Sequence, residues 1–419
     1  MSFIIAAPAS GSGKTTITLG LLRAVSRTQA VRAAKSGPDY IDPRFHEAAC
    51  GQPCYNLDAW AMSVARIRAL AAGSTPLIIE GAMGLFDGAP PDGKGATADL
   101  ARILGLPVIL VVDASAMAQS IAPLVAGFAA FDPAVRIAGV ILNRTGSDRH
   151  IEMLKRALAP NGIPVLGAVP RQTALARPSR HLGLVQAGEM TDLEPFLDHA
   201  ADVMSNHIDI ARLLTLGGTV PSAAPPITTP PKYARIAVAR DAAFAFTYAH
   251  DVAKWTDAGT EIRWFSPLAD DPVPEADQIF LPGGYPELHA AQLAQAQTFL
   301  NSLRNAAQTT AIYGECGGYM ILGETLTDAD GIRHKMAGLL GLDTSFSSRK
   351  LHLGYRKLRY AQSDKGDVLN GHEFHYATTV RAEGMPLFKA QDAQGNRLPP
   401  MGLVEGRVSG SFAHVIDVA

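Results

Sequence analysis

The chain has 419 residues, which is long for one hydrophobic core and predicts two domains of roughly 200 residues each. Hydrophobic residues make up 47% and charged residues 18%, and the formal net charge of −2 gives no basic footprint for nucleic acid. The longest apolar run, Leu106 to Val112, is about a third of the length of a membrane-spanning helix, so we expect no membrane partner. The absence of a secretory signal pattern and the sparse set of 3 cysteines predict a cytoplasmic protein.

In the first half of the chain, short aliphatic runs alternate with stretches of helical periodicity. The runs end in polar or glycine-rich turns and lie at residues 3–7, 77–79, 108–112 and 137–142. Continuous apolar strands of this kind are typical of a parallel sheet covered by helices on both faces. We therefore predict an α/β domain over residues 1–216, in which the last stretch, residues 193–216, is helical.

A proline-rich segment, residues 217–232, separates this half from a second α/β pattern. Its five prolines predict a stiff, extended connector and therefore a domain boundary. Strand patterns recur afterwards at residues 235–239, 278–281 and 310–313, and the last two run into glycines. We predict a second α/β domain over residues 233–419.

The segment after the first predicted strand has the features of a phosphate-binding loop. It reads Pro-Ala-Ser-Gly-Ser-Gly-Lys-Thr-Thr and meets the pattern GxxxxGK[ST] except at the first glycine, where Pro8 stands. Backbone N–H groups of such a loop surround phosphates at a helix N-terminus, where Lys14 would reach the β- and γ-phosphates. We expect ATP to bind through Gly11, Ser12, Gly13, Lys14, Thr15 and Thr16.

Carboxylates at strand ends are the expected metal partners of this loop, because the carboxyl ends of parallel strands form the ligand edge of the sheet. The candidates are Asp39, Asp42 and Glu80. We predict that Thr15, Asp39 and Glu80 hold Mg²⁺ beside the phosphates. Asn143 ends another predicted strand and is placed to read the edge of an adenine base.

A cysteine in the second half has the surroundings of a nucleophile. Residues 312–320 read Ile-Tyr-Gly-Glu-Cys-Gly-Gly-Tyr-Met, so Cys316 lies between a strand and a helix in a tight turn. We expect the helix N-terminus to favour its thiolate, which would attack a glutamine amide, form a thioester and release ammonia. The expected oxyanion donors are the N–H groups of Gly284 and Gly317, and the expected base is His414, after the final strand.

Two polar features keep more than one interpretation. Asp113 ends a predicted strand, and a ligand role and a solvated position are equally favoured for it. The cluster Gly-His-Glu-Phe-His at residues 371–375 could orient glutamine, face the other domain or pair internally. Its spacing does not rank these three roles.

Together these motifs resemble the cobyrinic or hydrogenobyrinic acid a,c-diamide synthases of cobalamin biosynthesis. The resemblance spans nearly the whole chain and rests on the motifs at residues 10–16, 37–42, 80–88, 281–287, 314–320 and 371–375. It implies a P-loop, dethiobiotin-synthetase-like domain joined to a class I, flavodoxin-like glutamine amidotransferase domain. It also implies that the a and c carboxylates of the corrin macrocycle are amidated with ATP, Mg²⁺ and L-glutamine, through an acyl phosphate.

The resemblance also implies roles for single residues. Cys316 is then the glutaminase nucleophile and His414 activates it. The residues that match positions around the nucleotide and the corrin carboxylates are Asp39, Tyr40, Ile41, Glu80 and Asp87. Ordinary class I amidotransferases complete the triad with His-x-Glu, whereas His414 is followed by Val-Ile-Asp, so the group that orients His414 is open.

Other functions are compatible with parts of the pattern. Cobyric acid synthases amidate other corrin carboxylates and are usually longer chains. A P-loop regulatory ATPase with an inactive amidotransferase domain would explain the phosphate loop, but such switches often carry a lysine where this chain has Ala9, and the cysteine elbow is intact. A diamide synthase, with a homodimer as a compatible assembly, accounts for both motifs.

Overall fold

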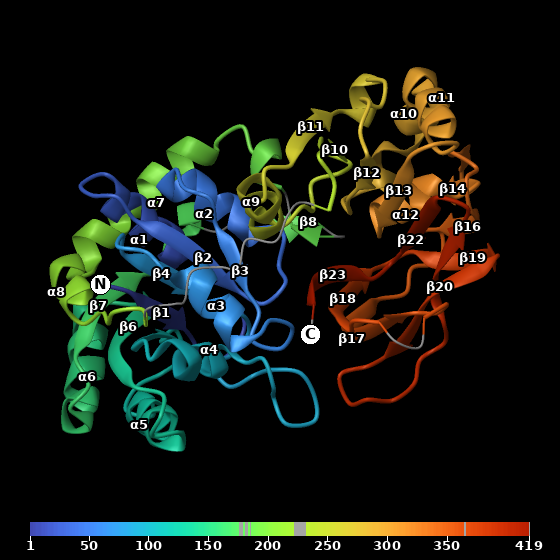
Figure 1. Ribbon diagram of the computed structural model, residues 1–419. Helices are drawn as coiled ribbons and strands as arrows, with labels where there is room; N and C mark the ends of the chain where they lie inside the picture. Colours follow the sequence, from blue (N-terminus) through green and yellow to red (C-terminus); the bar gives the residue numbers. More distant parts are fainter. Residues whose placement is uncertain (176–178, 181–182, 185, 222–231, 364–365, 419) are drawn as a thin grey trace. The chain divides into compact units, whose positions relative to one another are not determined.

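The computed structural model describes residues 1–175, 179–180, 183–184, 186–221, 232–363 and 366–418. The chain divides into two compact units, Met1–Pro226 and Ile227–Ala419 (Figure 1). Most of the predicted connector, residues 217–232, lies outside the described residues. In its described part, Gly218 exchanges two backbone hydrogen bonds of 2.7 and 2.8 Å with Ser2, so this end of the segment belongs to the first unit.

The first unit is built on a 7-stranded parallel sheet with the strand order β3-β2-β4-β1-β5-β6-β7. Its strands are β1 (Phe3–Ala6), β2 (Arg32–Ser36), β3 (Tyr55–Leu57), β4 (Leu77–Glu80), β5 (Val108–Asp113), β6 (Ile137–Thr145) and β7 (Val165–Pro170). The four predicted strands are confirmed as β1, β4, β5 and β6. Because β1 lies between β4 and β5, the loop that follows β1 opens at the middle of the sheet's carboxyl edge.

Helices cover both faces of this sheet, and Figure 1 shows α1, α2 and α7 on one side with α4 and α5 on the other. The helices are α1 (Lys14–Ser26), α2 (Asp42–Cys50), α3 (Val64–Ala71), α4 (Thr97–Leu104), α5 (Ile121–Phe131), α6 (Asp148–Leu158), α7 (Leu193–His207) and α8 (Ile210–Thr215). A short ribbon, β8 (Ser179–Arg180) and β9 (Gly183–Leu184), belongs to the same unit.

The stretch predicted to be helical, residues 193–216, forms two helices, because the chain leaves the helix between α7 and α8. Ile208 pairs its backbone with Gly167 on β7 instead of continuing the helix. Asp209 then accepts a 2.9 Å hydrogen bond from the Arg212 N–H and caps α8. The break therefore exchanges helical hydrogen bonds for a sheet contact and a new N-cap.

The helix after the phosphate loop buries its apolar side against the sheet and α7. Ile17, Leu21 and Val25 are buried, as their spacing predicts, and each contributes roughly 1.5–3 kcal/mol of transfer free energy. A Cβ added to Gly20 would lie 2.6 Å from the Ala200 carbonyl oxygen, so only glycine lets α1 and α7 approach this closely.

The second unit contains a 10-stranded mixed sheet with the order β11-β10-β12-β13-β22-β21-β20-β17-β18-β23. Strands β11 to β22 of this order are parallel neighbours, and from β22 onward the neighbours are antiparallel. The strands are β10 (Arg235–Ala239), β11 (Glu261–Phe265), β12 (Gln278–Leu281), β13 (Ala311–Glu315), β17 (His352–Tyr360), β18 (Leu369–His375), β20 (Met385–Gln391), β21 (Met401–Glu405), β22 (Val408–Ser411) and β23 (His414–Val418).

In the described part of this unit, a second sheet and four α-helices complete the fold. The 4-stranded sheet β15-β14-β16-β19 consists of β14 (Thr325–Thr327), β15 (Arg333–Lys335), β16 (Gly341–Ser345) and β19 (Thr378–Glu383). The helices are α9 (Ala249–Asp257), α10 (Ala290–Gln295), α11 (Gln297–Ala306) and α12 (Gly317–Leu322). Both units are α/β, so the predicted fold class is confirmed, although the antiparallel part of the large sheet was not predicted.

The position of His414 differs from the sequence prediction. The residue is the first of β23, the final strand, whereas we expected it to follow the final strand. The β18–β23 pairing places His372 and His414 directly opposite each other. The histidine is therefore held in a sheet and not in a terminal loop.

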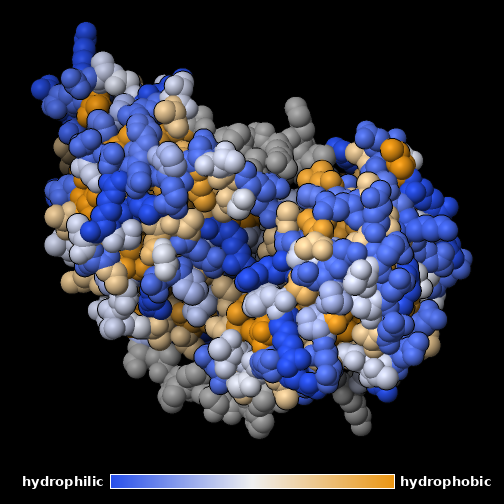
Figure 2. All heavy atoms as spheres, turned by 90° about the horizontal axis from the view of Figure 1, so that it is seen from above, coloured by the Kyte–Doolittle hydropathy of each residue, from blue (hydrophilic) through white to orange (hydrophobic). Residues whose placement is uncertain are grey.

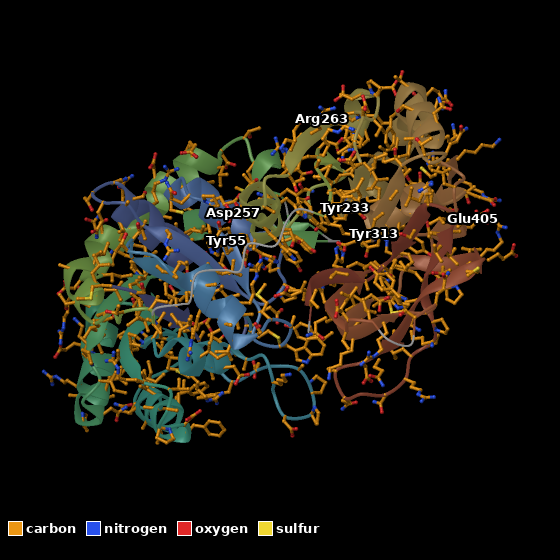
Figure 3. The ribbon with its side chains drawn as sticks, viewed as in Figure 1. Tyr55, Tyr233, Asp257, Arg263, Tyr313 and Glu405 are labelled. Atoms are coloured by element: carbon orange, nitrogen blue, oxygen red, sulfur yellow. The ribbon has the colours of Figure 1, made fainter. Side chains whose placement is uncertain are left out.

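Figure 3 marks several of these strands by side chain, with Tyr55 on β3, Arg263 on β11 and Tyr313 on β13, which leads to Cys316. Figure 2 shows mainly hydrophilic side chains on the face that it presents, with apolar residues in small groups between them. Among the described helices, none combines the length and the apolar character that a membrane crossing requires.

Candidate active sites

The loop after β1 has the backbone of a phosphate-binding loop. Gly11 and Gly13 adopt left-handed φ values of 79° and 88°. A Cβ on Gly13 would also lie 2.2 Å from Asn143 Nδ2, so the position requires glycine for two reasons. The Ser12 hydroxyl donates to the Ala9 carbonyl at 2.8 Å and closes the loop, which forms although Pro8 replaces the usual first glycine.

A buried charge network lies beside this loop. Lys35, on β2, donates to Asp42 Oδ2 at 2.7 Å and to Glu80 Oε1 at 2.9 Å. The Thr15 hydroxyl donates to the same Glu80 oxygen at 2.6 Å and lies 3.5 Å from Asp42 Oδ2. His46 on α2 contacts the other Glu80 oxygen at 2.6 Å. Thr15 and Glu80 therefore lie together as predicted, while Lys35 and His46 were not predicted as members of the site.

The network controls the ionisation of its members. Burial alone would raise the pKa of Glu80, but the Lys35 ammonium and the contact with His46 hold it below its ordinary value. Burial alone would lower the pKa of Lys35, but the Asp42 and Glu80 carboxylates raise it. Burial lowers the pKa of Lys14, whose ammonium donates to the Met83 carbonyl. The pocket thus holds paired charges in a dry environment.

Asp39 has a different environment from the one we expected. Its Oδ1 accepts the N–H of Ile41 at 2.7 Å and that of Asp42 at 3.3 Å, so it holds the turn that opens α2. Burial, followed by the neighbouring Asp42, raises the pKa of Asp39 to about 6. Asp39 lines the cavity beside the phosphate loop, but Asp42 is the carboxylate that the fold brings within reach of the Thr15 hydroxyl.

The other residues expected around the substrate are less central to this cavity. The side chain of Ile41 packs against the first unit's core. Asp87 accepts the Gly84 N–H at 2.8 Å and shapes the turn after β4. Among the described residues, neither of these two nor Tyr40 lines the cavity beside the phosphate loop.

Asn143 braces the phosphate loop from the end of β6. Its Nδ2 donates to the Ser12 carbonyl at 2.8 Å. A second cavity adjoins it and is lined in part by Thr16, Ile17, Pro170 and Met204. Asp113, whose role we left open, pairs with Arg144 at 2.5 Å on the same edge of the sheet.

Cys316 lies at the turn between β13 and α12, as the elbow pattern predicts. Its φ of 48° is left-handed, which is unusual for a residue with a side chain and is typical of strained nucleophile turns. Its N–H donates to the Ser411 carbonyl at 2.8 Å and fixes the elbow to β22. A Cβ on Gly318 would lie 1.9 Å from the Leu281 carbonyl oxygen, which explains the small residue after the turn.

At Cys316, burial outweighs the effect that we expected from the helix N-terminus. Burial raises the pKa of the thiol above its ordinary value, and the nearby Glu287 carboxyl raises it further. A hydrogen bond from the Gly317 backbone lowers it by less. The resting form is the thiol, which requires a base to become a nucleophile.

The turn after β12 packs against the elbow. A Cβ on Gly317 would lie 3.1 Å from the Gly284 nitrogen, so the two residues expected to donate to an oxyanion are neighbours. The preceding Gly283 was not predicted. A Cβ there would lie 2.4 Å from His414 Cε1 and 3.3 Å from both His414 Nε2 and Cys316 Cβ, so the base and the nucleophile meet around this glycine.

The ring of His414 is enclosed on two sides. His372 stacks on it with ring centroids 5.0 Å apart and an interplanar angle of 14°. The Nδ1 atom of His414 lies 3.5 Å from Glu315 Oε2. The Tyr248 hydroxyl lies 3.0 Å from His372 Nε2. His372 thus belongs to the cysteine site, which resolves one part of the 371–375 cluster.

The remainder of that cluster pairs internally. Glu373 binds the Arg356 guanidinium at 2.7 Å and lies 3.1 Å from His375 Nε2. Possible ligand atoms of His352, Glu373 and His375 all lie within 4.8 Å of one another, a spacing that a metal ion could use. The Arg356 cation already neutralises Glu373, so the structure accounts for this group as an ion-pair network.

Comparisons with known proteins match both halves of the chain. Residues 3–185 match the family described as the CobQ/CobB/MinD/ParA nucleotide binding domain, and residues 235–417 match the CobB/CobQ-like glutamine amidotransferase domain. The chain is 56% identical over 430 residues to a protein of Brucella anthropi named hydrogenobyrinate a,c-diamide synthase. The alignment covers 99% of this chain and 98% of the relative.

Proteins of the same name from Rhizobium meliloti and Rhodobacter capsulatus are 51% and 49% identical to this chain. They cover 99% and 98% of it, and 98% of each relative is matched. These values far exceed what a shared fold alone produces. With both domains matched in order and relatives this similar over nearly their whole length, the chain belongs to the hydrogenobyrinate a,c-diamide synthase family.

Proposed function

We propose that this chain amidates the a and c carboxylates of hydrogenobyrinic acid, with ATP as the energy source and L-glutamine as the nitrogen donor. One observation carries the proposal. A phosphate loop with Lys14 and a nucleophile elbow with Cys316 lie on one chain that is 56% identical over 99% of its length to a protein named hydrogenobyrinate a,c-diamide synthase. A regulatory ATPase would not need the elbow, and a free glutaminase would not need the loop.

The first unit would activate the acid. A carboxylate is a poor electrophile, so transfer of the γ-phosphoryl group from ATP makes an acyl phosphate and leaves ADP. Lys14 would neutralise charge on the transferring group. Mg²⁺ fits the three oxygen-bearing side chains of Thr15, Asp42 and Glu80, because it prefers carboxylate and hydroxyl oxygens together with phosphate. We propose Asp42 as a ligand in the place where the sequence suggested Asp39.

Nucleotide binding has a second support next to the phosphate loop. The cavity beside Asn143 combines the apolar side chains of Ile17, Pro170 and Met204 with polar groups at its edge. A cavity that offers both apolar contacts and polar groups suits a purine ring. We propose that adenine binds there and that the Asn143 amide has two tasks, to brace Ser12 and to contact the base.

The second unit would make ammonia. Because burial disfavours the free thiolate, Cys316 would transfer its proton to His414 as the sulfur attacks the glutamine amide carbon. The N–H groups of Gly284 and Gly317 would bind the oxyanion. The proton would then pass from His414 to the departing nitrogen, and water would release glutamate from the thioester. Ammonia displaces phosphate from the acyl phosphate.

Several finer points belong to the same proposal. The relatives' name refers to the metal-free corrin, and we propose this macrocycle over the cobalt form. Cobyric acid synthase, which acts on other carboxylates, is the second candidate in the same class. A cytoplasmic location and a homodimer remain predictions from the sequence.

Mass spectrometry tests the proposal directly. Each candidate macrocycle is incubated with the protein, ATP, Mg²⁺ and glutamine, and the masses of the products are measured. We expect hydrogenobyrinic acid to gain two amides, with ATP hydrolysed in step. No amide on any corrin, or amides gained only by a corrin whose a and c carboxylates are already amidated, would overturn it.

A further inference from the structure

His414, the base of the cysteine site, lacks the acidic residue that follows it by two positions in ordinary class I amidotransferases. His414 is followed by Val415 and Ile416, so no carboxylate lies two positions after it on β23. An imidazole that shuttles protons needs a partner at its other nitrogen, which selects the tautomer and stabilises the imidazolium. Such a partner has to come from another strand.

We propose that Glu315, the residue immediately before the nucleophile, is the positioning carboxylate of His414. The proposal rests on the glutaminase role assigned to Cys316 and His414 above. Glu315 Oε2 lies 3.5 Å from His414 Nδ1, and both side chains are buried, with exposures of 7% and 2%. The pair therefore lies in a low-dielectric environment, where a carboxylate acts strongly on a nearby ring.

Backbone contacts fix the carboxylate in place. Glu315 Oε1 accepts the N–H of Val415 at 3.1 Å, so one oxygen is tied to the strand that carries the histidine and the other faces its ring. The parallel pairing of β13 with β22 places Glu315 opposite Ser411, three residues before His414. The nucleophile, its base and the carboxylate are thus joined through two adjacent strand ends.

One face of the His414 ring is covered by an uncharged group. Burial, followed by the proximity of His414, lowers the pKa of His372 well below its ordinary value, so His372 is neutral. It stacks on the His414 ring and is held by the Tyr248 hydroxyl. His372 can therefore restrict the plane of the ring, while Glu315 supplies negative charge at Nδ1.

This arrangement selects the tautomer that catalysis requires. With its proton on Nδ1, directed at Glu315, His414 presents a lone pair at Nε2. The contacts of Gly283 place the Cε1–Nε2 edge of the ring on the side of Cys316. The thiol proton can then move to Nε2 as the S–C bond forms, and Glu315 stabilises the imidazolium until the proton leaves with ammonia. The 3.5 Å separation would shorten when glutamine binds, as catalytic hydrogen bonds commonly do.

The test is the variant Glu315→Gln, because an amide keeps the size of the side chain and an acceptor for Val415. It replaces the oxygen at Nδ1 by a donor and favours the wrong tautomer. We expect kcat for glutamine hydrolysis to fall by about 10²-fold or more, with KM for glutamine changed by less than about threefold. Glu315→Asp, which keeps the charge, should recover at least about tenfold of that loss.

Two controls separate this role from a structural one and from failure of the proposed function. Amidation with ammonium in place of glutamine should be unchanged in Glu315→Gln, which shows that the first unit works, while an unchanged KM for glutamine shows that the second unit is folded. Asp343→Asn is the matched buried carboxylate, since Asp343 on β16 pairs with Arg333 and Arg381. It should leave kcat for glutamine hydrolysis within about twofold of the parent.

A parent-like kcat in Glu315→Gln would overturn the proposal. So would an equal loss in the Gln and Asp variants without recovery of kcat. Should Glu315→Gln fail to fold, nitrogen NMR of histidine-labelled parent protein gives an independent answer, because the shifts of Nδ1 and Nε2 report the tautomer. We expect the His414 proton on Nδ1, and a proton found on Nε2 would refute the role of Glu315. A parent without glutaminase activity would instead refute the proposed function itself.

Discussion

The substitution Lys35→Met tests the interpretation of the buried network beside the phosphate loop. The Lys35 side chain is 5% exposed and is the cation between Asp42 and Glu80, of which Glu80 is 1% exposed. Methionine keeps the length of the side chain but leaves two buried carboxylates without that cation. Removing one partner of a buried ion pair typically costs about 3–5 kcal/mol.

The expected effect is large enough to measure by calorimetry. For a unit of this size, 1 kcal/mol shifts the unfolding midpoint by about 2–4 °C, so Lys35→Met should lower the midpoint of the first unit by roughly 6–20 °C. Lys155→Met, at an exposed position on α6, is the matched control and should change the midpoint by less than about 2 °C.

A second substitution identifies the cause of this loss. In Lys35→Met/Asp42→Asn one of the two uncompensated charges is removed, so the double variant should be more stable than Lys35→Met alone. Lys35 holds the pKa of Glu80 below its ordinary value, so its contribution to stability is present at neutral pH and is lost as the pH falls. The deficit of Lys35→Met should therefore shrink in acid. Equal midpoints for Lys35→Met and Lys155→Met, or a further loss in the double variant, would refute the reasoning.

Two further predictions concern the cysteine site. A Cβ on Gly283 would collide with the His414 ring, so Gly283→Ala should lower glutamine-dependent turnover by about 10²-fold. Its ammonium-dependent amidation should equal that of the parent, and the control variant Gly366→Ala should keep the parent's glutamine-dependent turnover. A parent-like turnover in Gly283→Ala would mean that the ring does not lie there during catalysis. Burial raises the pKa of Glu287 from its ordinary 4.5 to about 7, so this carboxyl should make the folded protein less stable as the pH rises from 4.5 to 7. Glu287→Gln should remove that part of the pH dependence in unfolding experiments, and identical pH profiles would show that desolvation does not raise the pKa of Glu287.

The elements with strong local signals could be predicted from the sequence. A buried parallel strand and a tight turn each require particular residue types, so both can be recognised in the sequence. This holds for the aliphatic runs of β1, β4, β5 and β6 and for the glycine-rich turns around Lys14 and Cys316. Strand β2 could not be found in this way. It reads Arg-Ala-Ala-Lys-Ser, lacks β-branched residues and becomes a strand only because β3 and β4 pair with it.

The site residues that the sequence did not predict were missed for the same reason, because their roles depend on how strands pair. Lys35 was not predicted because its strand was not, and its charge has meaning only next to Asp42 and Glu80. Glu315 is next to the nucleophile in the sequence, but the direction of its side chain depends on how β13 pairs with β22. The thiolate expectation for Cys316 did not include desolvation, which local sequence does not reveal and which exceeds the effect of the hydrogen bond from the Gly317 backbone.

The central claim is that Lys14 and Cys316 serve a single amidation, one by energising an acid and the other by making its nitrogen donor. The most direct measurement is the mass of hydrogenobyrinic acid products formed by Cys316→Ser and Lys14→Ala, each supplied with glutamine or with ammonium. The account predicts that Cys316→Ser forms amide from ammonium alone and that Lys14→Ala forms amide from neither donor. Amide formed from glutamine by Cys316→Ser at the parent's rate, or continued amidation by Lys14→Ala, would contradict it.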